Sequence, residues 1–259
     1  MAHEVLILMY HALDGGSGGP AGTDPHYTVD TRRFGDQLDL LAASGLQLGC
    51  ARDGLARSQS SGVWLTFDDG DLSNWEQAFP QLCQRGLRAD FFVNPARVGR
   101  AGYCSWPQLR EMAAAGMSIQ SHGMDHVYFT HLSRDALVQD LQRSRRHIED
   151  ALGQQVCLLA PPGGRCPPGL ARVASECGYR GVLGSAPGTL RNGVLRGFAP
   201  RVAVLAGHSP EQLRLWATRG RSALRRQRLR YRMLATLKGV LGDRGYEALR
   251  ARLLGGDGG

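Results

Sequence analysis

The chain has 259 residues, of which 42% are hydrophobic and 21% are charged, and its formal net charge is +8. These proportions are ordinary for a globular protein and exclude a wholly disordered or fibrous chain. The length allows one large domain or two small ones. No apolar run has the roughly 18 residues that a membrane-spanning helix requires, so no such helix is expected.

The positive charge is concentrated near the C-terminus. Between Arg219 and Leu254, ten Arg and one Lys stand against two acidic residues, a net charge of +9 that leaves −1 for the rest of the chain. Arginines decorate several faces of this segment, and its apolar stripe consists of Leu229, Met233, Leu237, Val240 and Leu241. The stripe either packs on the body of the protein or lies on an anionic membrane surface. Nucleic acid is disfavoured as a partner, because Tyr231 is the one aromatic residue between residues 219 and 232.

Seven short apolar runs alternate with longer segments of helical periodicity. Several runs are continuous rather than alternating, as in parallel strands that are covered on both faces. In chain order, the predicted strands are Val5–Met9, Val63–Phe67, Asp90–Val93, Met117–Ser121, Val156–Leu159, Tyr179–Leu183 and Arg201–Leu205. The predicted helices are Thr31–Ser44, Leu72–Arg85, Trp106–Ala115, Ser133–Leu152 and Pro167–Cys177.

This alternation predicts an α/β fold with a parallel sheet, open or closed into a barrel. We expect a body of residues 1–208 and a basic helical C-terminal extension of residues 209–259. Ser133 is the expected N-cap of its helix, and Pro167 is expected in the first turn of another. The six cysteines lack the spacing of a disulfide framework and no basic, apolar leader is visible, which together favour reduced thiols in the cytoplasm.

Two adjacent carboxylates, Asp68 and Asp69, end the second predicted strand and are followed by Gly70. In α/β barrels, functional groups lie at the carboxyl ends of strands. Two ionised carboxylates this close in a dry site repel each other, so a cation or a shared proton must relieve the repulsion. An Asx turn or a helix N-cap is the structural alternative for such a pair.

Two histidines, His122 and His126, follow the fourth predicted strand. Their spacing lets both imidazoles face one cation from a single turn, and a carboxylate would complete a set of two His and one Asp with open coordination positions. Open positions are what metal-assisted hydrolysis requires. A purely structural pair is the alternative. An Fe(II) oxygenase with the same set is disfavoured, because it gives the Asp68–Asp69 pair no task.

The loop Leu158–Gly164 follows the fifth predicted strand and is rich in Pro and Gly, so it can present a backbone N–H to an oxyanion. The Asp-Asp-Gly, the His-x-x-x-His and this loop, in that order, resemble the NodB-homology polysaccharide deacetylases (carbohydrate esterase family four). The N-terminal Leu8-Met9-Tyr10-His11 is also similar to the opening of such chains. The resemblance covers roughly residues 5–205. It implies a distorted (β/α) barrel of about seven parallel strands that removes acetyl groups from N- or O-acetylated sugars.

The resemblance also assigns roles to residues. Asp68 would be the general base. Asp69, His122 and His126 would hold a divalent metal ion, expected to be Zn²⁺, and the Gly163 N–H would help to hold the oxyanion.

Two motifs depart from the family pattern. The family's Arg that orients the catalytic base is replaced by Ala160, and Arg165 is a candidate substitute. The late Leu-x-His motif, which supplies the acid, is matched only by Leu205-Ala206-Gly207-His208, one residue too long. His208 is therefore the candidate acid, with His131 or a water-borne proton as alternatives. His11 ends a predicted strand and either lines the same site or has a structural role.

These observations predict a metal-dependent hydrolase that removes an acetyl group from an acetamido sugar or a related glycoconjugate. The basic C-terminal segment suggests a lipid-linked substrate and a cytoplasmic protein, peripheral at the inner membrane face. The alternative is a non-catalytic, metal-containing glycan-binding protein. The missing Arg at position 160 and the lengthened Leu-x-His motif favour this alternative. No feature of the sequence indicates an oligomeric state.

Overall fold

The computed structural model describes residues 4–15, 24–55, 62–191, 193–195, 197–234 and 236. Most of its strands form one sheet. They are β1 (Glu4–Tyr10), β4 (Gln47–Gly49), β5 (Gly62–Phe67), β6 (Asp90–Val93), β7 (Ser118–Ser121), β8 (Leu158–Leu159), β9 (Gly181–Leu183), β10 (Thr189–Arg191), β11 (Gly197–Ala199) and β12 (Val202–Ala203). Two further strands, β2 (Ala12–Asp14) and β3 (Thr28–Asp30), pair only with each other.

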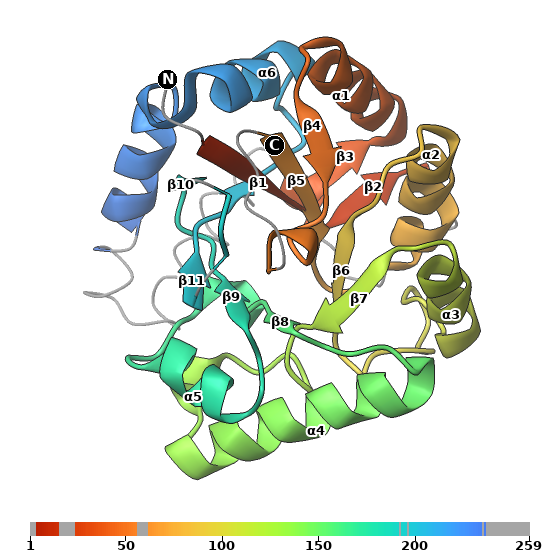
Figure 1. Cartoon of the computed structure of the whole chain (residues 1–259), viewed down its shortest axis with the longest axis vertical. Coiled ribbons are helices and arrows are strands. Elements are labelled where there is room, and N and C mark those ends of the chain that lie inside the picture. Colours follow the sequence, from red (N-terminus) through yellow and green to blue (C-terminus); the bar gives the residue numbers. More distant parts are fainter. Residues whose placement is uncertain are drawn as a thin grey trace, which may run out of the picture.

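The large sheet is predominantly parallel and curls into a nearly closed barrel with helices around it (Figure 1). Its order is β10-β1-β5-β6-β7-β8-β9-β11, with β12 also pairing with β1 and β4 with β5. The antiparallel exception is β10 on β1. The predicted distorted (β/α) barrel is confirmed. All seven predicted strands are present, whereas β2, β3, β4, β10 and β11 were missed because three residues carry too little periodicity to be recognised.

The helices around the barrel are α1 (Thr31–Ala43), α2 (Phe79–Gln84), α3 (Trp106–Ala114), α4 (Arg134–Leu152), α5 (Leu170–Glu176) and α6 (Pro210–Arg219). The five helices predicted between strands are confirmed, and the Ser133 hydroxyl caps α4 by accepting from the Ala136 N–H. Two details were wrong. The helix expected at Leu72–Arg85 contains a wide π turn before α2, next to Pro80, which has no N–H to donate. Pro167 precedes α5 by three residues instead of lying in its first turn.

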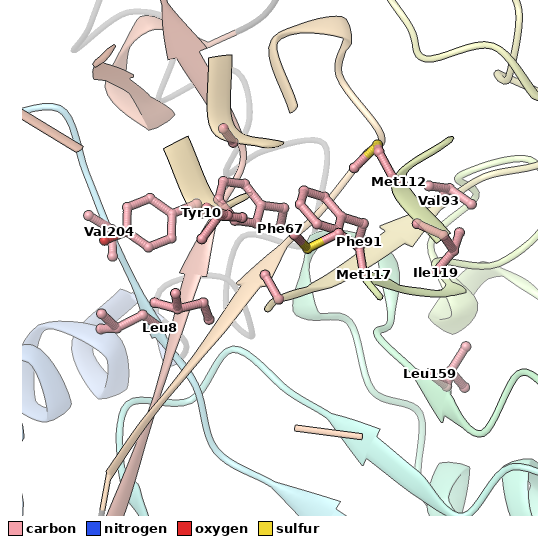
Figure 2. Packing of buried hydrophobic residues seen from close by; sticks show 14 of the residues in the cluster. Leu8, Tyr10, Phe67, Phe91, Val93, Met112, Met117, Ile119, Leu159 and Val204 are labelled. Atoms are coloured by element: carbon pink, nitrogen blue, oxygen red, sulfur yellow. The ribbon is translucent and has the colours of Figure 1, made fainter. Parts of the chain in front are cut away.

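The strands bury both faces, and successive residues alternate between two apolar layers. Leu65 and Phe67 of β5 pack outward against the helices, whereas Trp64 belongs to a second cluster that also contains Phe92 and Ala160. In the outer layer, the rings of Tyr10, Phe67 and Phe91 stack in a row across three neighbouring strands, with centroids 5.3 and 4.8 Å apart (Figure 2). This alternation fixes which side chains at the strand ends turn into the barrel.

The C-terminal part begins with α6, which packs against α1 and β1. The boundary at residue 208 stays a prediction. Residues 225–234 are also helical. Their Leu229 and Met233 are 62% and 65% exposed, so these two members of the apolar stripe do not pack on the body as one reading expected. Leu237, Val240 and Leu241 lie outside the described residues. No helix within the described ranges is long and apolar enough to cross a membrane.

Candidate metal centre

The polar residues of the site lie at the carboxyl edge of the barrel, directly after β5 and β7. Side chains alternate along β5, and Phe67 points outward. Thr66 and Asp68, its two neighbours in the chain, therefore point into the barrel. The Asp68 N–H still continues the ladder by donating to the Tyr10 carbonyl at 2.9 Å. Asp69 then leaves the strand with a φ of 75°, a left-handed conformation that is uncommon for a non-glycine residue. This bend lets two consecutive carboxylates face different partners.

Asp68 is held by Arg201, a residue whose role the sequence did not reveal. Its two carboxylate oxygens accept from Nη1 and Nη2 of Arg201, each at 2.7 Å, and both side chains are at most 4% exposed. Arg201 is fixed in turn, since its Nε donates to the Gly184 carbonyl at 2.9 Å and its guanidinium lies over the Phe92 ring. A buried, two-point contact of this kind locks both the rotamer and the charge of the carboxylate.

Asp69 faces the two histidines. Its Oδ1 lies 2.9 Å from His126 Nε2 and 3.3 Å from His122 Nε2. The His122 Nδ1 lies 2.8 Å from the Ala160 carbonyl oxygen. Because a carbonyl only accepts, Nδ1 carries the proton and Nε2 points its lone pair toward Asp69. The predicted convergence of Asp69, His122 and His126 is therefore present, with the three ligand atoms within 4.8 Å of one another.

The charge states suit this arrangement. Burial raises the pKa of both carboxyls, but Arg201 and His122 hold the pKa of Asp68 below its ordinary value. The pKa of Asp69 also lies well below its ordinary value, because a proton carried by His122 or His126 would bond to its carboxylate. Burial lowers the pKa of His126, even though Asp69 opposes that shift. At neutral pH, both carboxylates are ionised and His126 is neutral.

The residues fit a divalent ion. Asp69 Oδ1 is a buried oxygen without a hydrogen-bond partner in the described chain, and the Nε2 of His122 beside it presents a lone pair rather than a proton. Such a cluster of acceptors is unfavourable unless a cation lies among them. One carboxylate oxygen and two imidazole nitrogens are a donor set that suits Zn²⁺ and similar ions. His126 keeps a left-handed φ of 59° in this cluster, a strained conformation of the kind found at functional sites.

The Pro- and Gly-rich loop lies beside the histidines, as expected. A Cβ on Gly163 would come within 2.7 Å of the ring of Tyr128, and the φ of Gly163 is 59°, so only glycine fits there. The ring of Tyr128 lies two residues beyond His126 in the chain. Arg165 stacks over the Tyr128 ring. The guanidinium that bonds to both oxygens of Asp68 is that of Arg201, whereas Arg165 was the candidate.

The remaining histidines lie in different surroundings. His11 is close enough to influence the charges of Asp68 and Asp69, which agrees with a place at the site. His131 contacts the edge of Tyr128. His208 accepts from the Leu205 N–H and packs edge-on against Trp216 of α6. Burial lowers the pKa of His208 to about 4, so it is neutral at neutral pH.

The sequence contains one faint signal for Arg201. It is a charged residue at the start of an otherwise apolar predicted strand, and burial of such a charge requires a partner. The partner is 133 residues away in the chain, so no local spacing points to it. The cysteines, by contrast, are as expected: all six are free.

The fold and the site define a class: a parallel (β/α) barrel with an Asp-His-His cluster that could hold a cation at the carboxyl edge of its strands. The chain belongs to the NodB-homology polysaccharide deacetylases, because the sequence profile of the family described as "Polysaccharide deacetylase" matches residues 56–182 and relatives and solved structures agree. The predicted family is thereby confirmed.

Among curated relatives, the Bacillus subtilis protein YxkH is 26% identical over 191 residues, 71% of this chain and 66% of the relative. The peptidoglycan-N-acetylglucosamine deacetylase of Bacillus cereus is 33% identical over 124 residues, 48% of this chain and 56% of the relative. The chain therefore spans less than two thirds of the length of these relatives.

Two solved structures cover more of the chain. IcaB from Ammonifex degensii is 28% identical with a TM-score of 0.72, over 84% of this chain and 98% of that one. The Streptococcus pyogenes deacetylase PplD has a TM-score of 0.72 at 24% identity, over 82% of this chain and 96% of that one, and supports the fold.

Proposed function

We propose that this chain hydrolyses the acetamido group of an N-acetylated sugar in a glycan or glycoconjugate, and that it needs a divalent metal ion, expected to be Zn²⁺, to do so. One observation carries the proposal: the acceptor cluster of Asp69, His122 and His126 lies beside the ionised Asp68. The names of the Bacillus cereus and Streptococcus pyogenes relatives, both deacetylases, agree with this activity.

The residues of the chain have separable tasks. A divalent ion held by Asp69, His122 and His126 would polarise the acetyl carbonyl and lower the pKa of a water molecule. Asp68 accepts the proton of the attacking water as general base. Arg201 keeps Asp68 ionised and fixes its orientation, because both carboxylate oxygens bond to the guanidinium. The Gly163 N–H would donate to the oxyanion.

The leaving amine requires a proton. His208 was the candidate donor, but a pKa of about 4 leaves it neutral and without an acidic proton at neutral pH, and its imidazole contacts Leu205 and Trp216 of α6. The proton that Asp68 has just accepted is available in the site and can return to the amine. We therefore favour Asp68 in both roles, with His208 as the alternative donor.

Acetate release tests the activity. The purified chain is assayed on a panel of N-acetylated and O-acetylated sugars after chelation and again after addition of Zn²⁺ or Co²⁺. We expect turnover to disappear with the chelator and to return with the metal. Unchanged turnover in excess chelator would contradict metal dependence.

The alternative is a glycan-binding protein that keeps the metal and lacks catalysis. The absence of an Arg at position 160 favoured this alternative. Arg201, however, supplies a guanidinium to Asp68, and this contact supports the enzyme instead. Full metal occupancy without acetate release from any sugar of the panel would favour the binding protein.

The exposed helix of residues 225–234 supports a further part of the proposal, that the chain acts at an anionic membrane surface on a lipid-linked substrate in the cytoplasm. Leu229 and Met233 lie one turn apart on its exposed face, and Arg225, Arg226 and Arg232 flank them. Flotation with anionic and with neutral liposomes tests this. Binding only to anionic liposomes, weakened by Leu229→Gln with Met233→Gln, is expected, and equal failure on both kinds would remove this part.

A further inference from the structure

The turn that carries both candidate histidine ligands has no regular secondary structure. Residues 122–126 follow β7 and belong to neither a helix nor a strand. Two of them have left-handed backbone conformations, Gly123 with a φ of 78° and His126 with a φ of 59°. A histidine keeps such a conformation only when its surroundings impose it. Contacts from neighbouring elements must therefore fix the positions of the two imidazoles.

The loop after β6 holds the carbonyl groups of this turn. The Asn94 Nδ2 donates to the His122 carbonyl at 2.5 Å and to the Gly123 carbonyl at 3.1 Å. The Ala96 N–H donates to the Met124 carbonyl, also at 3.1 Å. All three contacts satisfy carbonyl oxygens, so the N–H groups of the turn need acceptors from another element.

Helix α4, which packs against β7, supplies these acceptors. The Asp140 Oδ1 accepts from the Met124 N–H at 3.1 Å, and the carboxylate also accepts from the Asp125 N–H. Burial, more than any other cause, raises the pKa of Asp140 to about 6, while the Met124 N–H opposes the rise. At neutral pH most of this carboxyl is ionised and can only accept, as the two donors require.

Gly123 lets the carboxylate reach the turn. A Cβ at this position would lie 3.1 Å from Asp140 Oδ1 and 3.0 Å from the Phe129 ring, closer than an ordinary van der Waals contact. The Gly123 N–H donates to the Ser121 hydroxyl at 3.2 Å, and Ser121 bonds to Ser144 of α4 at 2.8 Å. Helix α4 therefore supports the turn from two positions one helical turn apart, and Asp140 is the one that reaches the residues between the histidines.

We infer that Asp140 is a positioning residue for the proposed metal centre. Its carboxylate holds the turn between His122 and His126, so that the Nε2 atoms of both imidazoles converge on Asp69 Oδ1. Groups behind the ligands that orient them in this way typically contribute about 10–100-fold to metal affinity. The inference rests on the proposed function, in which these ligands hold a divalent ion, and adds a residue that acts on the ion through the turn.

Metal affinity measures this role separately from turnover. The metal-free chain and its variants are titrated with Zn²⁺ against a competing chelator. In Asp140→Ala, the Kd for Zn²⁺ is expected to rise by about tenfold or more. In Asp140→Asn, it should stay within about threefold of the parent value, because the amide oxygen still accepts from the Met124 N–H. The visible absorption of the Co²⁺ form should change in Asp140→Ala and be restored in Asp140→Asn.

Asp150→Ala is the matched control, because Asp150 is an exposed aspartate of the same helix. It should leave the Zn²⁺ affinity and the Co²⁺ spectrum as in the parent. A role confined to fold stability would lower the urea midpoint of Asp140→Ala without changing either readout. If Asp140→Ala does not fold, Asp140→Ser replaces it, since its hydroxyl is one bond shorter than the carboxylate oxygen.

Parent-like Zn²⁺ affinity in Asp140→Ala, or an equal loss in Asp140→Asn or Asp150→Ala, would overturn the inference, whereas acetate release by the parent would still support the proposed function. Weakened affinity in Asp140→Ala, restored in Asp140→Asn, while the parent releases acetate from no sugar, would contradict the proposed function and leave this inference standing.

Discussion

Two aspartates are buried at opposite ends of the barrel and have opposite acidities. Asp90 begins β6 at the amino edge, where its carboxylate accepts from the N–H groups of Ala51 and Arg52, and burial raises its pKa to about 6. Asp68 follows β5 at the carboxyl edge, where Arg201 bonds both of its oxygens, and its pKa lies below the ordinary value despite equal burial.

The difference shows that burial alone does not set the charge of a carboxyl group. Neutral N–H donors leave a large desolvation penalty on Asp90, whereas a guanidinium more than compensates it at Asp68. The amino edge of the barrel thus uses an aspartate to hold a loop, and the carboxyl edge keeps one ionised beside the candidate metal ligands. Changes at each end should therefore produce different effects.

The largest effect is expected from Asp68→Asn. The amide cannot accept a proton from water, so kcat/KM for acetate release should fall by about 10²–10⁴-fold. Metal occupancy should stay unchanged, because Asp68 is outside the acceptor cluster. A variant with nearly full activity would show that Asp68 is not the base.

Arg201→Met should make Asp68 resemble Asp90. Loss of one partner of a buried ion pair leaves an uncompensated charge and costs about 3–5 kcal/mol of unfolding free energy. The pKa of Asp68 should rise, so the remaining activity should decline on the acid side at a higher pH than in the parent. Urea unfolding and pH–rate profiles measure the two effects.

The double variant Asp68→Asn with Arg201→Met is the control for that experiment. If the unpaired buried charge causes the destabilisation, the double variant should lose less unfolding free energy than the two single variants lose when their losses are added. Strict additivity would mean that Arg201 stabilises the fold by its packing on Phe92 instead.

A smaller effect is expected at Asp90. A carboxyl whose pKa is about 6 in the folded chain and 3.8 unfolded binds extra protons in the folded state. The stability it contributes is present below about pH 4 and is lost as pH rises through about 6, by at most about 3 kcal/mol. Urea unfolding between pH 4 and 7 should show this slope in the parent and a flatter profile in Asp90→Asn. Identical slopes in the two proteins would contradict the assignment.

The sequence predicted the barrel and the convergence of the candidate metal ligands for the same reason: both depend on local patterns. Asp68, Asp69, His122 and His126 lie at the ends of recognisable strands, and parallel strands bring their carboxyl ends together. Arg201 escaped because it acts across the barrel on a residue far away in the chain. The environment of His208 also escaped, because its contact with Trp216 depends on how α6 packs.

Metal stoichiometry tests the central claim most directly. Chelated protein is dialysed against Co²⁺ or Zn²⁺, and bound metal per chain is measured together with the visible absorption of the Co²⁺ form. The account predicts one ion per chain in the parent and in Asp68→Asn, and none in His126→Ala or Asp69→Asn at the same metal concentration. Equal metal binding by all four proteins would contradict it.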